Sequence, residues 1–144
     1  MKKEIDPKMH SAEHILNQTM VRMFDCNRSF SAHIEKKKSK CDYHFERALT
    51  EEEINQIENR VNDVIQADMM VTEEYITREE SQKQYNLERL PQNAGENIRI
   101  VKIGEYDACP CIGSHVKSTR EIGEFRIVSV SFKSAVLRIR FKIA

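Results

Sequence analysis

The chain has 144 residues, enough for one domain with a buried core and few for two. Its 23 basic and 23 acidic side chains leave a formal net charge of zero, so bulk charge points to no particular partner. The sequence holds no apolar run long enough to span a bilayer, and its start, MKKEIDPKMHSAEH, lacks the apolar stretch of a secretory signal. We therefore expect a cytoplasmic protein without a membrane span, in which thiols stay reduced.

Two helices and a strand pair are predicted in the first half of the chain. Residues 6–25 predict a helix with an apolar stripe of Met9, Ile15, Leu16, Met20, Met23 and Phe24. Residues 29–46 predict two short strands joined by a lysine-rich turn. Residues 49–68 predict a second helix, in which Thr50 and Glu53 have the spacing of a capping box. Its apolar stripe comprises Ile54, Ile57, Val61, Val64 and Ile65.

The second half of the chain favours strands. We predict strands at 69–77 and 98–104, a short helix from Arg78 to Tyr85, and a loop at 90–96. Residues 123–143 predict a long hairpin, which places Leu137, Ile139, Phe141 and Ile143 on the face opposite Arg138, Arg140 and Lys142. Together these elements predict one α+β domain over residues 1–144, an antiparallel-rich sheet with helices packed on it.

Charge is unevenly distributed along the neutral chain. Residues 50–80 hold ten acidic and two basic side chains, whereas residues 116–144 hold seven basic and two acidic ones. A second basic cluster comprises Lys36, Lys37, Lys38 and Lys40. Basic patches of this kind could hold a polyanion such as RNA. The competing interpretation is an ordinary solvated surface.

Two short motifs carry residues suited to a metal. HSAEH places His10 and His14 one helical turn apart, and CIGSH places Cys111 and His115 four residues apart around Gly113. Imidazoles and a thiolate suit zinc better than calcium or magnesium, and four such ligands complete a tetrahedron. Cys109 is a rival to Cys111, while a redox pair is less favoured because CPC has one residue between its cysteines.

The motifs HSAEHIL, LTEEEINQIENRVNDVI and CIGSHVKSTREIGEFRI together resemble the alanyl-tRNA synthetase editing domain, and more closely its freestanding short relatives, the AlaX trans-editing proteins. The resemblance extends over nearly the whole chain and implies the editing-domain fold shared with threonyl-tRNA synthetase. The ordered pair HxxxH…CxxxH is specific to that group. The family's common CGGTH is CIGSH here, a departure that keeps the ligands but alters the loop between them.

The resemblance implies an aminoacyl-tRNA deacylase that removes a wrong amino acid, most often serine, from the acceptor end of tRNA(Ala). It implies zinc held by His10, His14, Cys111 and His115, no nucleotide cofactor, and no ligase activity. His10 and His14 would also be catalytic, since we expect zinc to act at the substrate. Ser31 falls where short relatives place a threonine that reads the substrate hydroxyl, with Ser114 a second candidate; an ordinary strand serine is the alternative.

Three further expectations complete the interpretation. Lys36, Lys37, Lys38, Lys40, Arg138, Arg140 and Lys142 are the candidate RNA-binding residues. We expect Glu13 to point away from the face shared by the two helical histidines, so it is not assigned as a general base. The alternative functions are a deacylase for another mischarged tRNA, as in threonyl-tRNA synthetase, and a noncatalytic zinc-stabilised module that binds RNA.

Overall fold

The computed structural model describes residues 6–85 and 95–144, so most of the loop predicted at 90–96 lies outside the described residues. Both long helices form where the apolar periodicity predicts them, α1 at Pro7–Phe24 and α2 at Glu51–Gln66. The Asp6 carboxylate caps α1, and Thr50 and Glu53 form the predicted capping box of α2. Among the described residues, no helix is both long and apolar enough to cross a bilayer.

The larger sheet is antiparallel and has the strand order β1-β2-β7-β6. Its strands are β1 (Ser31–His33), β2 (Ser39–His44), β6 (Phe125–Lys133) and β7 (Val136–Ile143). The predicted hairpin is confirmed: Ser134 and Ala135, both with positive φ, form the two-residue turn between β6 and β7. The apolar face of this sheet, with Leu137, Ile139 and Phe141 fully buried, packs on the helices.

A smaller antiparallel sheet has the order β3-β4-β5. Its elements are β3 (Val71–Thr77), β4 (Asn97–Ile103) and β5 (Asp107–Pro110), with α3 (Arg78–Gln84) following β3 and the 3-10 helix η1 (Thr119–Ile122) following β5. The sequence predicted β3, α3 and β4 but neither β5 nor η1. The fold is α+β and antiparallel, as predicted, although its strands form two sheets.

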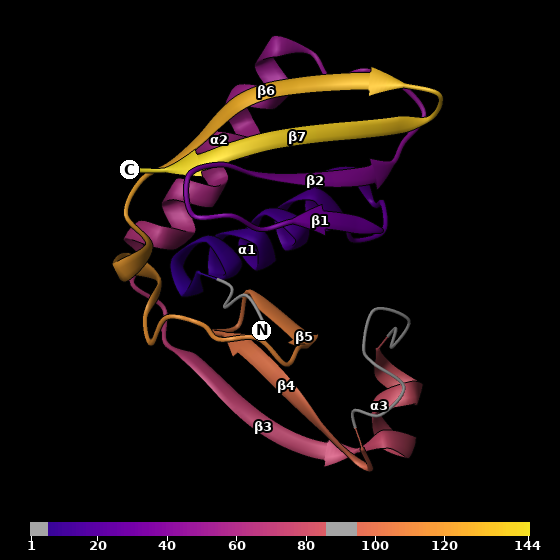
Figure 1. Ribbon diagram of the computed structural model, residues 1–144, viewed down its shortest axis with the longest axis vertical. Helices are drawn as coiled ribbons and strands as arrows, with labels where there is room; N and C mark the ends of the chain where they lie inside the picture. The colour runs from indigo at the N-terminus through magenta and orange to yellow at the C-terminus, as the bar shows by residue number, and fades with distance from the viewer. Residues whose placement is uncertain (1–5, 86–94) are drawn as a thin grey trace.

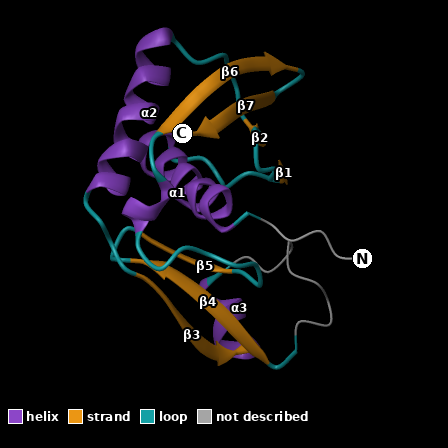
Figure 2. Cartoon of the chain, turned by 60° about the vertical axis from the view of Figure 1, so that its left-hand side comes forward, coloured by secondary structure: helices purple, strands orange, loops and turns teal. Residues whose placement is uncertain are grey.

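Helix α1 lies between the two sheets (Figures 1 and 2). One side of it joins the core through fully buried Ile15 and Leu16. The other side faces β5, where His14 and Gln18 contact Asp107 and Arg22 donates to the backbone carbonyl of Tyr106. Because His14, Gln18 and Arg22 are spaced by four residues, they form one stripe along the helix. This stripe brings the N-terminal histidines to the segment that carries the cysteines.

Candidate metal centre

The first two candidate ligands project from one turn of α1. His10 and His14 are 6% and 3% exposed, and their ring centroids lie 5.0 Å apart. Two imidazoles buried this deeply need polar partners or a metal. The predicted pairing of these two histidines is therefore present in the fold.

The other two candidate ligands come from the loop after β5, which crosses α1 at His10. A Cβ atom on Gly113 would lie 2.3 Å from His10 Cε1, so only glycine allows this close approach. The Arg99 guanidinium on β4 donates to the carbonyl of Gly113 at 2.7 Å and to that of Cys111 at 3.3 Å. The loop is thus held against the helix from its opposite side.

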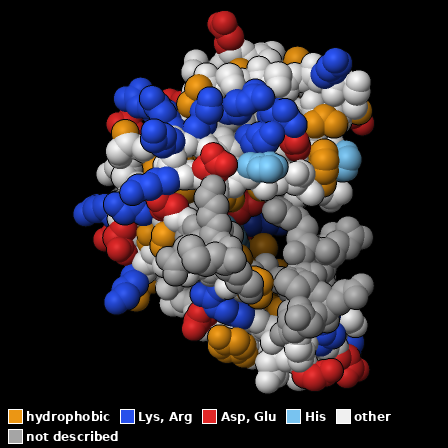
Figure 3. Space-filling view, in the orientation of Figure 1, with side chains coloured by type: hydrophobic (Ala, Val, Ile, Leu, Met, Phe, Trp, Pro, Cys, Tyr) orange, Lys and Arg blue, Asp and Glu red, His pale blue; other side chains and the backbone are white. Residues whose placement is uncertain are grey.

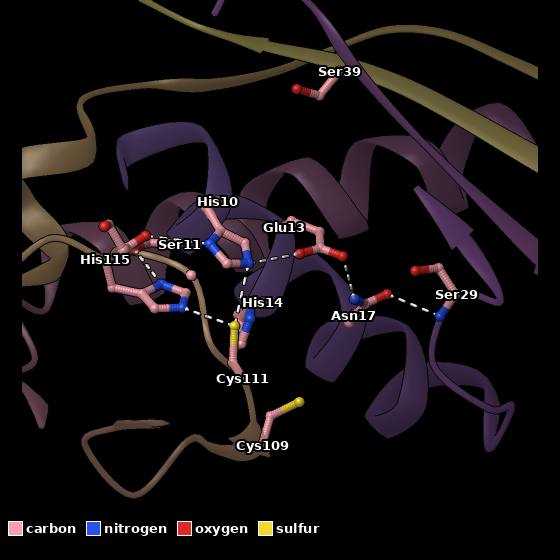
Figure 4. Close-up of polar contacts among 12 residues, drawn as sticks. His10, Ser11, Glu13, His14, Asn17, Ser29, Ser39, Cys109, Cys111 and His115 are labelled. Atoms are coloured by element: carbon pink, nitrogen blue, oxygen red, sulfur yellow. Dashed lines mark hydrogen bonds and ion pairs between the residues drawn. The ribbon is translucent and has the colours of Figure 1, made fainter. Parts of the chain in front are cut away.

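The four side chains form one cluster, shown in Figure 4. One ligand atom from each of His10, His14, Cys111 and His115 lies within 4.8 Å of every other. Cys111 Sγ is 3.4 Å from His10 Nε2 and 3.5 Å from His115 Nε2. Three imidazoles and one thiolate make a donor set that fits a tetrahedral zinc ion.

Protein groups hydrogen-bond to the outer nitrogens of His10 and His115, whereas the outer nitrogen of His14 has an ion-pair contact but no hydrogen bond within the described residues. His10 Nδ1 lies 3.2 Å from the carbonyl oxygen of Ser114, and His115 Nδ1 lies 2.9 Å from Ser11 Oγ. His14 Nδ1 faces Asp107 Oδ2 at 3.6 Å. Partners of this kind fix the ring orientation and leave Nε2 for a metal. The residues therefore fit a zinc ion in their secondary contacts as well as in their donor atoms.

Asp107, on the β5 strand that the sequence did not predict, contacts both His14 and Arg28. It is 4% exposed and receives hydrogen bonds from Arg28 Nη1 at 2.7 Å and Gln18 Nε2 at 3.0 Å. Burial alone would raise its pKa, but His14 and Arg28 hold the pKa of Asp107 below its usual value. An ionised carboxylate therefore faces His14 Nδ1.

The electrostatics of the metal-free cluster favour a thiolate. Burial would raise the pKa of Cys111, but hydrogen bonds from His10, His115 and His14 lower it to about 3. Burial would also lower the pKa of His14, yet Asp107 and Cys111 raise it to about 9. The pKa of His115 falls to about 4, chiefly because of burial. The cluster thus holds an imidazolium–thiolate pair before any metal binds.

Cys109, the rival ligand, lies outside the four-residue cluster. Burial raises the pKa of its thiol to about 12, and the thiol donates to the carbonyl of Pro110 at 3.4 Å. A protonated thiol engaged in this way is a poor metal ligand. Among the described residues, Cys111 is the cysteine that the fold brings to the histidines.

The expected orientation of Glu13 is wrong. Its carboxylate is buried, at 4% exposure, and Oε1 lies 3.6 Å from His10 Nε2. Glu13 Oε2 accepts a hydrogen bond from Asn17 Nδ2 at 3.4 Å. Residues three apart on a helix are neighbours, so Glu13 reaches the side of His10 although it precedes His14 directly. It borders the cluster without being one of the four candidate ligands.

The fold does not bring Ser31 to the cluster. The strand register sets Ser31 opposite Asp42, whose carboxylate pairs with Arg138 on the outer face of the larger sheet. The helix-facing positions alternate with these and include Tyr43, whose hydroxyl reaches Asn17 on α1. Ser114, the second candidate, is exposed in the loop, where its carbonyl faces His10.

Ser29, which the sequence interpretation did not consider, is buried beside α1. It is 2% exposed, and its backbone N–H donates to Asn17 Oδ1 at 3.1 Å. In Figure 4, Ser29 lies beyond Asn17 with its hydroxyl on the side of Glu13. The signal that could have found it is the serine pair in RSFS, which offered two hydroxyls and not one.

The two basic patches of the sequence meet on the outer face of the larger sheet. The register pairs Lys40 with Arg140, and Arg126 with Lys142. Figure 3 shows Lys and Arg side chains gathered in a band across the upper part of the molecule. Lys36, Lys37 and Lys38 are exposed in the connection between β1 and β2. Arg138 differs from the others, because it forms a two-pronged ion pair with Asp42 at 2.7 and 2.9 Å.

Comparisons with known proteins match part of one domain family and one region of the alanine–tRNA ligases. Residues 98–139 match the family described as the threonyl and alanyl tRNA synthetase second additional domain. The alanine–tRNA ligase of Thermoanaerobacter sp. strain X514 is 35% identical over 130 residues, which cover 90% of this chain and 15% of the ligase. That of Fervidobacterium nodosum is 33% identical over 139 residues, 96% of this chain and 16% of the ligase. That of Coxiella burnetii strain Dugway is 33% identical over 130 residues, again 90% and 15%.

Over residues 98–139 the chain is similar to the threonyl and alanyl tRNA synthetase second additional domain, and over most of its length it is similar to one part of the alanine–tRNA ligases. It spans about 15% of the length of the alanine–tRNA ligases that it matches.

Proposed function

We propose that this domain is a zinc-dependent deacylase that hydrolyses mischarged tRNA, with Ser-tRNA(Ala) as its main substrate. The observation that carries the proposal is the buried cluster of His10, His14, Cys111 and His115 in a chain similar to one part of the alanine–tRNA ligases. The reaction would take place in the cytoplasm, and the free thiols of the described cysteines are consistent with that.

A bound zinc ion would supply a Lewis acid beside the ester carbonyl and lower the pKa of a neighbouring water. The protein residues would hold and orient the substrate around it. The outer partners of the imidazoles, above all Asp107, keep the donor atoms aimed at one point. A site held this firmly can position an ester for attack by water.

Selectivity for serine would come from a hydroxyl contact, for which we propose Ser29. A pocket built for alanine rejects serine by only about a hundredfold, because an added hydroxyl is poorly excluded. A second site that hydrogen-bonds that hydroxyl discriminates better, since alanine would leave buried polar groups unpaired. Ser29 is buried on the α1 side of the larger sheet, near Glu13.

The acceptor end of the tRNA would lie along the basic band that contains Lys40, Arg140 and Lys142. These residues share the outer face of one sheet, and Figure 3 shows a band of Lys and Arg side chains on the surface. Phosphate contacts made by such side chains weaken steeply with salt. Arg138 is a weaker candidate, because Asp42 already neutralises it.

The decisive experiment combines elemental analysis with a deacylation assay. We expect one zinc per chain and faster hydrolysis of Ser-tRNA(Ala) than of correctly charged Ala-tRNA(Ala). Gly- and Thr-charged tRNAs are included in the assay to test whether another mischarged tRNA is the main substrate. A double variant of His14 and Cys111 to alanine should lose both zinc and activity. Equal rates on seryl and alanyl esters would contradict the editing role.

A matched pair of serine variants tests the hydroxyl contact. Ser29→Ala should narrow the preference for seryl over alanyl ester while zinc stays bound. Ser31→Ala, two residues away on the outer face, is the control and should leave the preference unchanged. The reverse result would return the role to Ser31.

One observation favours a second function, a noncatalytic zinc-stabilised module that binds RNA. Four protein ligands close a tetrahedron, which is the usual pattern of structural zinc, whereas catalytic zinc keeps a position for water. This alternative expects RNA binding without turnover, and His10→Ala would then mainly lower the thermal stability.

A further inference from the structure

Glu13 is a buried acid at the edge of the His/Cys cluster. Its Oε1 lies 3.6 Å from His10 Nε2, the same nitrogen that lies 3.4 Å from Cys111 Sγ. The carboxylate therefore borders the point at which the donor atoms converge, although it is not one of the four. Burial of a carboxylate is unfavourable unless cations or hydrogen-bond donors compensate it, so its position here calls for an explanation.

A chain of hydrogen bonds fixes Glu13 from its other side. Asn17 Nδ2 donates to Glu13 Oε2 at 3.4 Å, and Asn17 Oδ1 accepts from the Tyr43 hydroxyl at 2.8 Å and from the Ser29 backbone N–H at 3.1 Å. Figure 4 shows the order in space: the cluster, then Glu13, then Asn17 and Ser29. The Glu13 carboxylate thus lies between the candidate metal ligands and Ser29, the residue proposed to bind the substrate hydroxyl.

A zinc-loaded cluster would carry a net positive charge, which an anion at the position of Glu13 would neutralise. A divalent ion and the Cys111 thiolate sum to one positive charge, while Asp107 and Arg28 neutralise each other in their ion pair. An aminoacyl ester carries an α-ammonium on the carbon next to its carbonyl. A positive site would repel that ammonium, and the Glu13 carboxylate brings the local sum to zero.

We propose that Glu13 binds the α-ammonium of the aminoacyl group, an inference that rests on the proposed deacylase function. The three groups bonded around the α-carbon of serine would each meet a partner: the carbonyl at the cluster, the ammonium at Glu13 and the hydroxymethyl group at Ser29. The substrate class is therefore aminoacyl esters with a free α-amine. Peptidyl and other N-acylated esters lack the positive charge and are rejected.

Two non-hydrolysable analogues test this role by binding alone. In the first, serine is joined to adenosine through an amide in place of the ester; the second is identical except that a hydroxyl replaces the α-amine. Calorimetry on the zinc-loaded wild type should show the amine form binding roughly 10- to 100-fold more tightly, the range expected for a hydrogen bond to a charged group. Equal affinities, or no binding of either analogue, would overturn the proposal.

Variants then assign the preference to Glu13. Glu13→Gln should bind both analogues with similar affinity and keep its zinc, because the residue is not a ligand. Asp25→Asn removes one charge from the exposed C-terminal end of the same helix and should keep the wild-type preference. If Glu13→Gln does not fold, equal affinities of the two analogues for the wild type still refute the proposal. A Glu13→Gln protein that keeps the full preference refutes the assignment.

The analogue assay and the deacylation assay separate the two proposals. Hydrolysis of Ser-tRNA(Ala) together with equal analogue affinities would leave the deacylase function intact and reject the role of Glu13. A preference for the amine form without any hydrolysis of mischarged tRNA would reject the deacylase and retain Glu13 as an ammonium-binding residue.

Discussion

Asp107→Asn should weaken zinc binding although Asp107 is not a metal ligand. The carboxylate faces His14 Nδ1 at 3.6 Å and is held by Arg28 at 2.7 Å. Asparagine keeps the shape and loses the charge, so the His14 ring loses the anion that fixes its orientation. Loss of a group that orients a metal-binding histidine lowers metal affinity about 10- to 100-fold, equivalent to roughly 1.4 to 2.7 kcal/mol.

The same substitution should lower the stability of the metal-free protein. Removal of one partner from a fully buried ion pair costs about 3 to 5 kcal/mol, but the Arg28 side chain is 28% exposed and can be partly rehydrated. We therefore expect a loss of about 2 kcal/mol in the free energy of unfolding. Urea denaturation of the metal-free protein measures this loss, and competition with a chromogenic chelator measures zinc affinity.

A core variant serves as the control for general destabilisation. Leu137→Ala in β7 removes a fully buried side chain and should cost about 2 to 5 kcal/mol without changing zinc affinity in the folded protein. Unchanged zinc affinity in Asp107→Asn would refute the orienting role. Equal losses of zinc affinity in both variants would attribute the effect to overall stability.

Three further predictions concern the cluster and the basic band. Gly113→Ala should leave less than one zinc per chain by elemental analysis, because the added Cβ would displace His10; full occupancy would contradict the close approach. Zinc binding near pH 7 should release about one proton, from His14 with its pKa of about 9, and none from Cys111, whose pKa of about 3 leaves it already ionised. The release should vanish well above pH 9, and calorimetry in buffers of different ionisation enthalpy measures it; no release at pH 7 would count against a charged His14. For tRNA binding, Arg140→Ala should reduce the slope of the logarithm of the binding constant against the logarithm of the salt concentration by about one. An unchanged slope would remove Arg140 from the RNA-binding surface.

Local rules predicted the helices and the cluster. The stripes of α1 and α2 repeat with the helical period, and the pairs His10/His14 and Cys111/His115 each have the spacing of one helical turn. The alternation of apolar and polar residues also predicted most of the strands. What one sequence lacks is the pairing between distant strands, so neither the separation into two sheets nor the short β5 could be predicted.

The errors at the site have the same origin. Ser31 was chosen by counting residues from the helix, but the register that decides which face a strand residue occupies depends on pairing with Asp42. The meeting of Lys40 with Arg140 likewise requires the β2–β7 pairing. Glu13 could have been found locally, since it lies three positions after His10 on one helix, but it was expected to point away from the face shared by the two histidines.

The candidate ligands lie far apart in the chain, since Cys111 follows His10 by 101 positions. During synthesis the N-terminal helix leaves the ribosome with only half of the donor set, and a fragment that ends before residue 111 offers a metal just two imidazoles from these motifs. A bound ion would also close a loop of about a hundred residues, which restricts the unfolded chain as a long-range cross-link does. Metal binding with all four ligands would therefore require that both segments have folded together, and it would stabilise the folded chain as well as complete the site.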